Sequence, residues 1–387
     1  MNALLAPIRA RFAGTSRAAA RVVAIVDLLE PNNLRPLFTV YNAARDLAGD
    51  LRRDLSFIRT LWRGLGPFPD RIRPHAGAIF GRPVPLRLPA ISGQRIGIVA
   101  SGGSGATAAV VGVRRAFEEA GLEPAVISAC SGSVLFALPW ACGLSAEEIG
   151  QFWLSLSTRD YVDPDWRAVA RGALTRFRGT TGLLRGEAIE RAFVKRFGDR
   201  RLGDTKIPFA AVVWNIDANR VEFLSSRRTP DLPVARVARI AISIPIMVEA
   251  VELGGAWYGD GGIVDIFPTA PLAEEEPLDL VIGTNSYLPE GFAGMDIGAW
   301  HAQPWSILRA SLQLRYAVYL ELAREHARQL GHRLELIEPV PHTDVRGARF
   351  YESFLDRRDW RRYMIAGRTA TRAALVRREA MAHRRAA

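Results

Sequence analysis

The sequence predicts an α/β fold, because segments typical of strands and helices alternate along its central part. Residues 95–100 are a short β-favouring run, residues 102–105 a glycine-rich turn, and residues 108–120 a helical segment. The same order follows again, with a strand at 125–128 and the start of a helix at 134–141. This repeated order indicates a sheet with functional loops at the carboxyl ends of its strands.

Further strands and a last helix are expected later in the chain. Residues 209–215 and 220–225 flank the turn Asp217-Ala218-Asn219 and are predicted to be strands, as are residues 278–284. Residues 359–387 are predicted to form a helix that carries many arginines. The composition, 49% hydrophobic and 24% charged, is that of an ordinary globular protein able to bury such a core.

The N-terminal part of the chain is expected to be helical and accessory. In residues 36–65 apolar side chains recur at spacings of three and four, which predicts a long amphipathic helix. Its apolar side either packs on the body of the protein or serves as an interaction surface for a membrane or a partner helix. Residues 66–93 hold six prolines, as a connector does. We therefore expect a helical extension with a Pro-rich connector (1–90), a catalytic domain (91–290) and a helical C-terminal region completing or flanking it (291–387).

The chain is strongly basic, with 51 Lys and Arg against 40 Asp and Glu and a formal net charge of +11. Only Lys195 and Lys206 are lysines, and abundant arginine and alanine are typical of a GC-rich genome, so part of the excess can be without function. The alternative is a surface attracted to polyanions. Because the basic residues are spread along the chain without a nucleic-acid motif, we expect an anionic membrane surface rather than nucleic acid as the partner. No oligomeric state is predicted.

The pattern of cysteines and apolar runs bears on the compartment. Cys130 and Cys142 form neither a disulfide framework nor a zinc-binding spacing. The chain has no apolar run of about 18 residues or more, and its N-terminus lacks a signal-peptide pattern. We expect a cytoplasmic protein that docks peripherally at the inner face of the membrane.

Three short stretches are candidates for chemistry, and the first is "ASGGSGAT", residues 100–107. A glycine-rich turn between a strand and a helix exposes backbone N–H groups at the positive end of the helix dipole. Such a turn binds an anion, either a phosphate or a developing oxyanion. Its glycines match neither the dinucleotide-binding pattern nor the phosphate-binding loop. A tight turn without a ligand is the alternative.

The second stretch is "VISACSGSVLF", residues 126–136, in which an apolar strand stops at small residues and an apolar helix follows. A serine on a sharp strand-to-helix turn presents its hydroxyl at a helix N-terminus, as a nucleophile requires. Ser131 is the candidate, since Ser128 still belongs to the strand and Ser133 to the helix. Ala129 and Ser133 are small, as a strained turn needs, but neither is glycine. A plain turn of small residues is the alternative.

The third stretch is "GAWYGDGGIVDIFP", residues 255–268, with Asp260 between an aromatic strand and two glycines. Gly261 and Gly262 free the backbone to turn sharply, and a carboxylate held there could deprotonate a serine. An Asp-Gly hairpin turn without chemistry is the alternative.

Histidine is the more familiar base for a serine nucleophile, and the chain has six. Only His342 lies at a strand-end loop in the chain order of a Ser-Asp-His triad. It is therefore a candidate base, and the other five histidines are expected at the surface.

Taken together, these stretches resemble the patatin-like phospholipase family, bacterial branch, over residues 96–286. The resemblance includes the glycine-rich loop, "ISACSGSV", Ser243-Ile244-Pro245 and the box at Asp260. It implies a three-layer α/β/α domain and a serine acyl-ester hydrolase acting on lipids, of phospholipase A or lysophospholipase type. Ser131 would be the nucleophile and Asp260 the base, without a histidine, metal or organic cofactor. The implied oxyanion hole comprises Gly102, Gly103, Ser104 and Gly105.

The chain departs from the family's pattern at several small residues. Ser104 replaces a glycine of a Gly-Gly-Gly run, Ala106 replaces a basic residue, and Ala129 and Ser133 replace both glycines around the serine. These departures leave two alternatives open. One is an intracellular polyester or neutral-lipid esterase, and the other is a catalytically weak, membrane-associated lipid-binding protein with a degenerate site.

Overall fold

The computed structural model describes residues 77–386 except 168–180, 276, 295–306 and 346–347. It divides the chain into two compact units, of which Phe57–Met295 with Val318–Ala387 is the larger. Of the other unit, Met1–Ser56 with Asp296–Ala317, the described part is residues 307–317. The predicted helix at 36–65 lies outside the described residues, as does the connector before residue 77.

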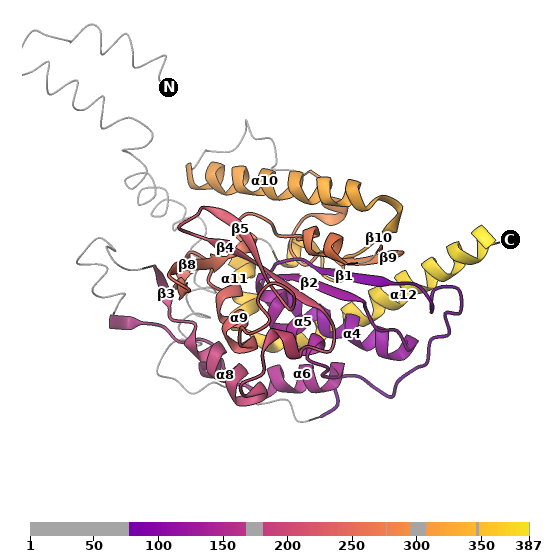
Figure 1. Ribbon diagram of the computed structural model, residues 1–387, viewed down its shortest axis with the longest axis horizontal. Helices are drawn as coiled ribbons and strands as arrows, with labels where there is room; N and C mark the ends of the chain where they lie inside the picture. Colours follow the sequence, from indigo (N-terminus) through magenta and orange to yellow (C-terminus); the bar gives the residue numbers. More distant parts are fainter. Residues whose placement is uncertain (1–76, 168–180, 276, 295–306, 346–347, 387) are drawn as a thin grey trace, which may run out of the picture. The chain divides into compact units, whose positions relative to one another are not determined.

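An eight-stranded, mostly parallel sheet forms the centre of the larger unit (Figure 1). Its order is β10-β9-β1-β2-β4-β8-β7, with β5 paired to β4. The pairs from β10 to β4 are parallel, whereas β8 and β5 run antiparallel to β4, and β7 antiparallel to β8. The strands are β1 (Ile96–Ala100), β2 (Val126–Cys130), β4 (Phe209–Asn215), β5 (Arg220–Ser225), β7 (Val251–Leu253), β8 (Ala256–Asp260), β9 (Leu280–Thr284) and β10 (Leu334–Ile337). A separate parallel pair joins β3 (Gly182–Leu184) to β6 (Ile246–Val248).

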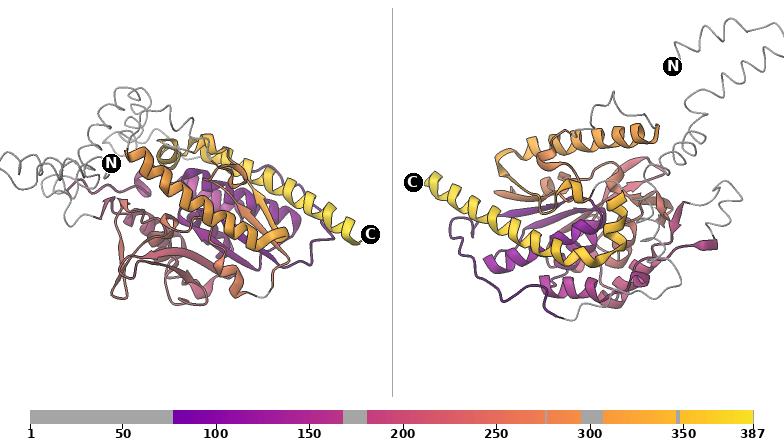
Figure 2. Two further views of the ribbon diagram at one scale, coloured as in Figure 1. Left: turned by 90° about the horizontal axis from the view of Figure 1, so that it is seen from above. Right: turned by 180° about the vertical axis from the view of Figure 1, so that it is seen from behind.

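Helices cover both faces of this sheet (Figures 1 and 2). On one side lie α4 (Ala109–Ala120), α5 (Val134–Ala141), α6 (Ala146–Ser155), α8 (Glu187–Phe197), α9 (Val234–Ala241) and α12 (Trp360–Ala386). On the other side lies the second half of α10 (Ile307–Leu330), and α11 (Ala348–Leu355) leads into α12. The predicted α/β class, with helices on both faces of a sheet, is confirmed.

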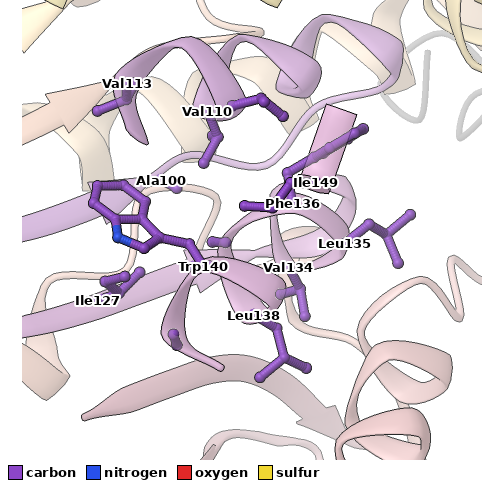
Figure 3. Close-up of a cluster of buried hydrophobic side chains, with 14 of the residues drawn as sticks. Ala100, Val110, Val113, Ile127, Val134, Leu135, Phe136, Leu138, Trp140 and Ile149 are labelled. Carbon is purple, nitrogen blue, oxygen red and sulfur yellow. The ribbon is translucent and has the colours of Figure 1, made fainter. Parts of the chain in front are cut away.

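The core lies between the sheet and the helices α4, α5 and α6. Figure 3 shows Val110 of α4, Ile127 of β2, and Leu138 and Trp140 of α5 within this cluster, with Trp140 beside Ile127. All residues of β1, β2 and β9 are buried, as expected for parallel strands covered on both faces. The apolar runs that predicted these strands are therefore the runs that form the core.

The long helix α12 is held closely against α4. A methyl group on Gly112 of α4 would lie 1.9 Å from the Met364 carbonyl oxygen, and one on Gly367 would lie 2.1 Å from the Ala109 carbonyl oxygen. The crossing therefore needs glycine on both helices. Beside it, Arg368 and Arg372 of α12 bind the buried carboxylate of Glu119 at 2.9 and 2.6 Å. The positive charges of these two arginines are therefore paired within the protein.

Most predicted elements are confirmed to within two residues. The strands at 209–215 and 220–225 have the expected bounds, β2 runs on to Cys130, and β9 begins at Leu280. Within the part of the chain that the structure covers, no helix combines the length and apolar character needed to cross a membrane. The three regions at 1–90, 91–290 and 291–387 stay a prediction.

Candidate active site

The register of β4 brings together two residues that are far apart in the sequence. β5 pairs along one edge of β4, so β2 and β8 share the other edge. Cys130, the last residue of β2, is opposite Val212, and Asp260, the last residue of β8, is opposite the next residue, Val213. Because both strands end at adjacent positions of β4, Ser131 and Asp260 meet at this edge.

Ser131 sits in a backbone conformation that a serine rarely adopts. It begins a 3-10 turn, Ser131–Ser133, between β2 and α5, and its φ is +52°, in the left-handed region. We call this turn the elbow. It leaves no space for a side chain at its middle residue, since a Cβ atom on Gly132 would lie 2.6 Å from the Gly103 carbonyl oxygen. Strain in a non-glycine residue persists only where the surroundings enforce it, and such residues gather at functional sites.

The Asp260 carboxylate is buried and held at both oxygens. Oδ2 accepts a hydrogen bond from Ser131 Oγ at 2.6 Å, and Oδ1 accepts one from the Gly262 N–H at 2.8 Å. Its backbone N–H donates to the Ser243 carbonyl oxygen at 3.0 Å. A carboxylate fixed in this way can accept a proton from Ser131 without reorienting.

A buried arginine that was not anticipated from the sequence is bonded to Ser243, whose carbonyl oxygen accepts the Asp260 N–H. Arg239 of α9 is 4% exposed and donates to Ser243 Oγ at 2.5 Å and to the Glu249 carbonyl at 2.9 Å. Burial lowers the pKa of this arginine from its usual value. The spacing of four residues between Arg239 and Ser243 could have indicated this contact, because residues four apart are neighbours on a helix. Ser243, however, lies beyond the end of α9 at Ala241, and its position there could not be read from the sequence.

The four residues predicted as an oxyanion hole have different surroundings. The Gly102 N–H donates to the Ile266 carbonyl oxygen at 2.8 Å. Gly105 is packed against α11, where an added Cβ would lie 1.8 Å from the Ser353 carbonyl oxygen. Gly103 and Ser104 line a cavity together with Ser131. Two of the four therefore face the cavity, and the other two have structural roles.

The cavity beside Ser131 has a volume of about 120 Å³ and a largely apolar wall. Its lining comes from segments between Gly103 and Phe354, which explains why no short stretch of sequence revealed it. The apolar residues are Tyr161, Val162, Leu183, Leu184, Ile189, Ile242, Ile244, Met247, Val248, Phe350 and Phe354. Such a lining suits the apolar part of a ligand.

The two cysteine thiols are buried and disfavoured as nucleophiles. Burial, with the nearby Asp260 and Asp265 carboxylates, raises the pKa of Cys130 well above its usual value. Burial raises the pKa of Cys142 to about 11. Since the thiolate is the reactive form, both are inert at neutral pH.

His342 and His326 are bonded to backbone carbonyl oxygens. His342 is buried, and its Nδ1 donates to the Tyr287 carbonyl oxygen at 2.7 Å, whereas Ser131 donates directly to a carboxylate. The expectation that the remaining histidines are at the surface is wrong for His326, whose side chain is only 12% exposed. It belongs to α10, and its Nδ1 donates to the Phe267 carbonyl oxygen at 2.7 Å and lies 3.7 Å from Asp265. Among the residues described here, no three His, Cys, Asp or Glu side chains gather as a metal site.

A serine on a strained strand-to-helix turn, bonded to a buried carboxylate at the end of a parallel α/β sheet, is typical of acyl hydrolases. Comparison with known proteins agrees with this class. Residues 98–273 match the family model "Patatin-like phospholipase". Over residues 98–273 the chain is therefore similar to the patatin-like phospholipase family.

The match to the relatives described here covers about half of this chain. Lysophospholipase nte1 of Aspergillus niger is 28% identical over 176 residues, which are 45% of this chain and 11% of the relative. An uncharacterized NTE family protein of Mycobacterium tuberculosis is 26% identical over 194 residues, 49% of each protein. The match thus spans about half of the mycobacterial relative and about a tenth of the fungal one. Among solved structures, VipD from Legionella pneumophila is similar, with a TM-score of 0.43, 14% identity, and coverage of 73% of this chain and 67% of VipD.

Proposed function

We propose that this protein is a serine acyl-ester hydrolase of lysophospholipase type, with Ser131 as the nucleophile and Asp260 as the base. The observation that carries the proposal is the 2.6 Å hydrogen bond from Ser131 Oγ to Asp260 Oδ2, at the end of an apolar cavity. A direct serine–carboxylate pair needs no histidine, because the carboxylate is already positioned to accept the proton.

The reaction follows from these positions. Ser131 Oγ attacks the ester carbonyl carbon, its proton passes to Asp260 Oδ2, and the carbonyl π electrons move to oxygen as an oxyanion. Collapse of the oxyanion breaks the bond to the alcohol oxygen, which takes the proton from Asp260 and leaves. Water then attacks the acyl-enzyme and gives a proton to Asp260. The second collapse releases the fatty acid and returns the proton to Ser131.

The oxyanion is held by the amides of Gly103 and Ser104 in this proposal. Both residues line the cavity with Ser131, whereas the Gly102 amide is already bonded to Ile266. One such donor contributes about 3 to 4 kcal/mol to transition-state stabilisation when it is preorganised in a site without water.

The apolar cavity supports a single acyl chain as the bound part of the substrate. Its wall includes Phe350 and Phe354 of α11, which supports the proposal that residues 291–387 complete the catalytic domain. A one-chain lipid would leave its polar head at the mouth, and the relative named a lysophospholipase agrees with this class of substrate. We propose an anionic membrane surface as the place of action.

The proposal is tested with a fluorophosphonate probe and a lysophospholipid substrate. Wild type is expected to be labelled and to release fatty acid, and both activities are expected to be lost in Ser131→Ala. Asp260→Asn is expected to lose turnover while it stays folded, because the amide cannot accept the proton. Ser128→Ala is the matched control, since Ser128 is a buried serine three residues away that bonds the Pro268 carbonyl oxygen.

Several results would redirect the assignment. Labelling that survives in Ser131→Ala would disprove the nucleophile. Hydrolysis of short soluble or neutral-lipid esters but not of lysophospholipid would favour the esterase alternative. A wild type that forms no acyl-enzyme with any activated ester would favour the lipid-binding alternative.

A further inference from the structure

Ser104 carries a hydroxyl that is buried at the candidate site and has no hydrogen-bond partner. The residue is 4% exposed, and within the described residues its Oγ has no donor or acceptor in reach. It lines the same cavity as Ser131 and Gly132. Leaving a buried hydroxyl without a partner is unfavourable, so such groups are rare unless they have a use.

The local backbone makes the unpaired hydroxyl more unusual. Ser104 is the residue before the 3-10 turn Gly105–Ala108, which leads into α4, and serine at such a position commonly caps the helix with its side chain. Here the side chain makes no cap hydrogen bond, and the Thr107 N–H is bonded to the Ser104 carbonyl oxygen instead. The hydroxyl is thus left for another partner.

We propose that the Ser104 hydroxyl is a catalytic residue that donates a hydrogen bond to the oxyanion formed when Ser131 attacks the ester. This inference rests on the proposed function and assigns the side chain a task beside the backbone amides of the glycine-rich loop. A hydroxyl hydrogen rotates to suit its acceptor and serves as an oxyanion donor in a site closed to water. In the free protein the hydroxyl has no partner because its partner is the substrate oxygen.

The test compares three variants in the full chain by steady-state hydrolysis of a lysophospholipid and by the rate constant of fluorophosphonate labelling. Ser104→Ala and Ser104→Gly both remove the hydroxyl, and Gly also removes the Cβ atom. Thr284→Val is the matched control, because Thr284 Oγ1 is likewise buried and unpartnered but does not line the cavity.

Both Ser104 variants are expected to lose about ten- to a hundredfold in kcat and in the labelling rate constant, with little change in KM. Loss of a group that acts only in the transition state lowers kcat and leaves KM unchanged, whereas loss of a purely structural group does not give this pattern. Stability to urea is expected to be unchanged or raised, since a buried unpaired hydroxyl is removed. Thr284→Val is expected to retain wild-type kinetics.

Ser104→Ala or Ser104→Gly with kinetics within about twofold of wild type would overturn the inference while leaving the proposed function intact. An equal loss of kcat and of the labelling rate constant in Thr284→Val would overturn it too. The loss would then result from removing any buried unpaired hydroxyl, and not from removing a donor to the oxyanion. A wild type without turnover and labelling, or activity that survives in Ser131→Ala, would instead mean that the proposed function itself fails.

Discussion

Ser133 replaces a glycine that the family resemblance leads one to expect, and it connects the elbow to the neighbouring strand. Its Oγ donates to the Ser101 carbonyl oxygen at 2.5 Å, and both residues are completely buried. Ser101 directly follows β1, and its own Oγ accepts from the Ser286 N–H at 2.9 Å. The serine therefore adds a hydrogen bond between the nucleophile turn and the glycine-rich loop, which a glycine could not make.

Ser133→Ala is expected to lower the free energy of unfolding by about 1 to 3 kcal/mol, because a buried hydrogen bond is lost. It is also expected to slow fluorophosphonate labelling, since the elbow is less firmly held. Urea denaturation and labelling kinetics measure the two effects. Ser128→Ala loses a comparable bond to Pro268 and should lose stability without slower labelling. Wild-type labelling in Ser133→Ala would contradict this role of Ser133.

At the scale of elements, buried charge fastens α12 to α4. The Glu119 side chain is completely buried, accepts hydrogen bonds from Arg368 and Arg372 of α12, and forms an ion pair with Arg115 of its own helix at 3.2 Å. Burial by itself raises the pKa of Glu119, but the hydrogen bonds from Arg368, Arg372 and the Val84 N–H outweigh it, so the pKa is lowered. The carboxylate therefore stabilises the folded state as long as it is ionised.

Glu119→Gln is expected to lower the free energy of unfolding at neutral pH by about 3 kcal/mol, because the arginines lose a buried countercharge. A carboxylate whose pKa is depressed on folding contributes its stability above the unfolded pKa, about 4.3, and loses it as the pH falls further. The difference between wild type and variant should thus narrow in acid, as measured by urea denaturation over a pH series. Glu123→Gln is the control, since its pair with Arg114 is exposed and contributes less than about 1 kcal/mol.

At the scale of the whole molecule, a net charge of +11 remains even if each acidic residue is paired with a basic one. Arg368 and Arg372 bind Glu119, and Arg377 and Arg378 bind Glu335, so these four positive charges of α12 are paired with carboxylates of the protein itself. We expect this unpaired positive charge to attract the protein to an anionic membrane surface. Each basic residue near the bilayer contributes about 1 kcal/mol to the free energy of binding.

We expect the protein to pellet with vesicles that contain anionic phospholipid at low salt and to be released at high salt, because screening weakens exposed charges. Vesicles of phosphatidylcholine alone are the control and should bind little protein. Equal binding to both compositions would instead indicate an apolar contact, and no binding to either would leave the basic charge without a membrane role.

The sequence was sufficient for features that depend on neighbouring residues. The strands β4 and β5 were predicted at their bounds because alternating β-favouring residues and a turn are local signals. Ser131 and Asp260 could be singled out as candidates because each lies where a predicted strand ends and has small residues beside it. Local pattern also placed a glycine-rich turn before α4.

Only the tertiary structure decided what these features do together. The serine and the aspartate are 129 residues apart, and they meet because β2 and β8 end at adjacent positions of β4. Which residues of the glycine-rich loop face the cavity depends on Ile266 and on α11, and the cavity wall itself comes from helices and strands distant in sequence. Register and packing are long-range properties, and no local pattern contains them.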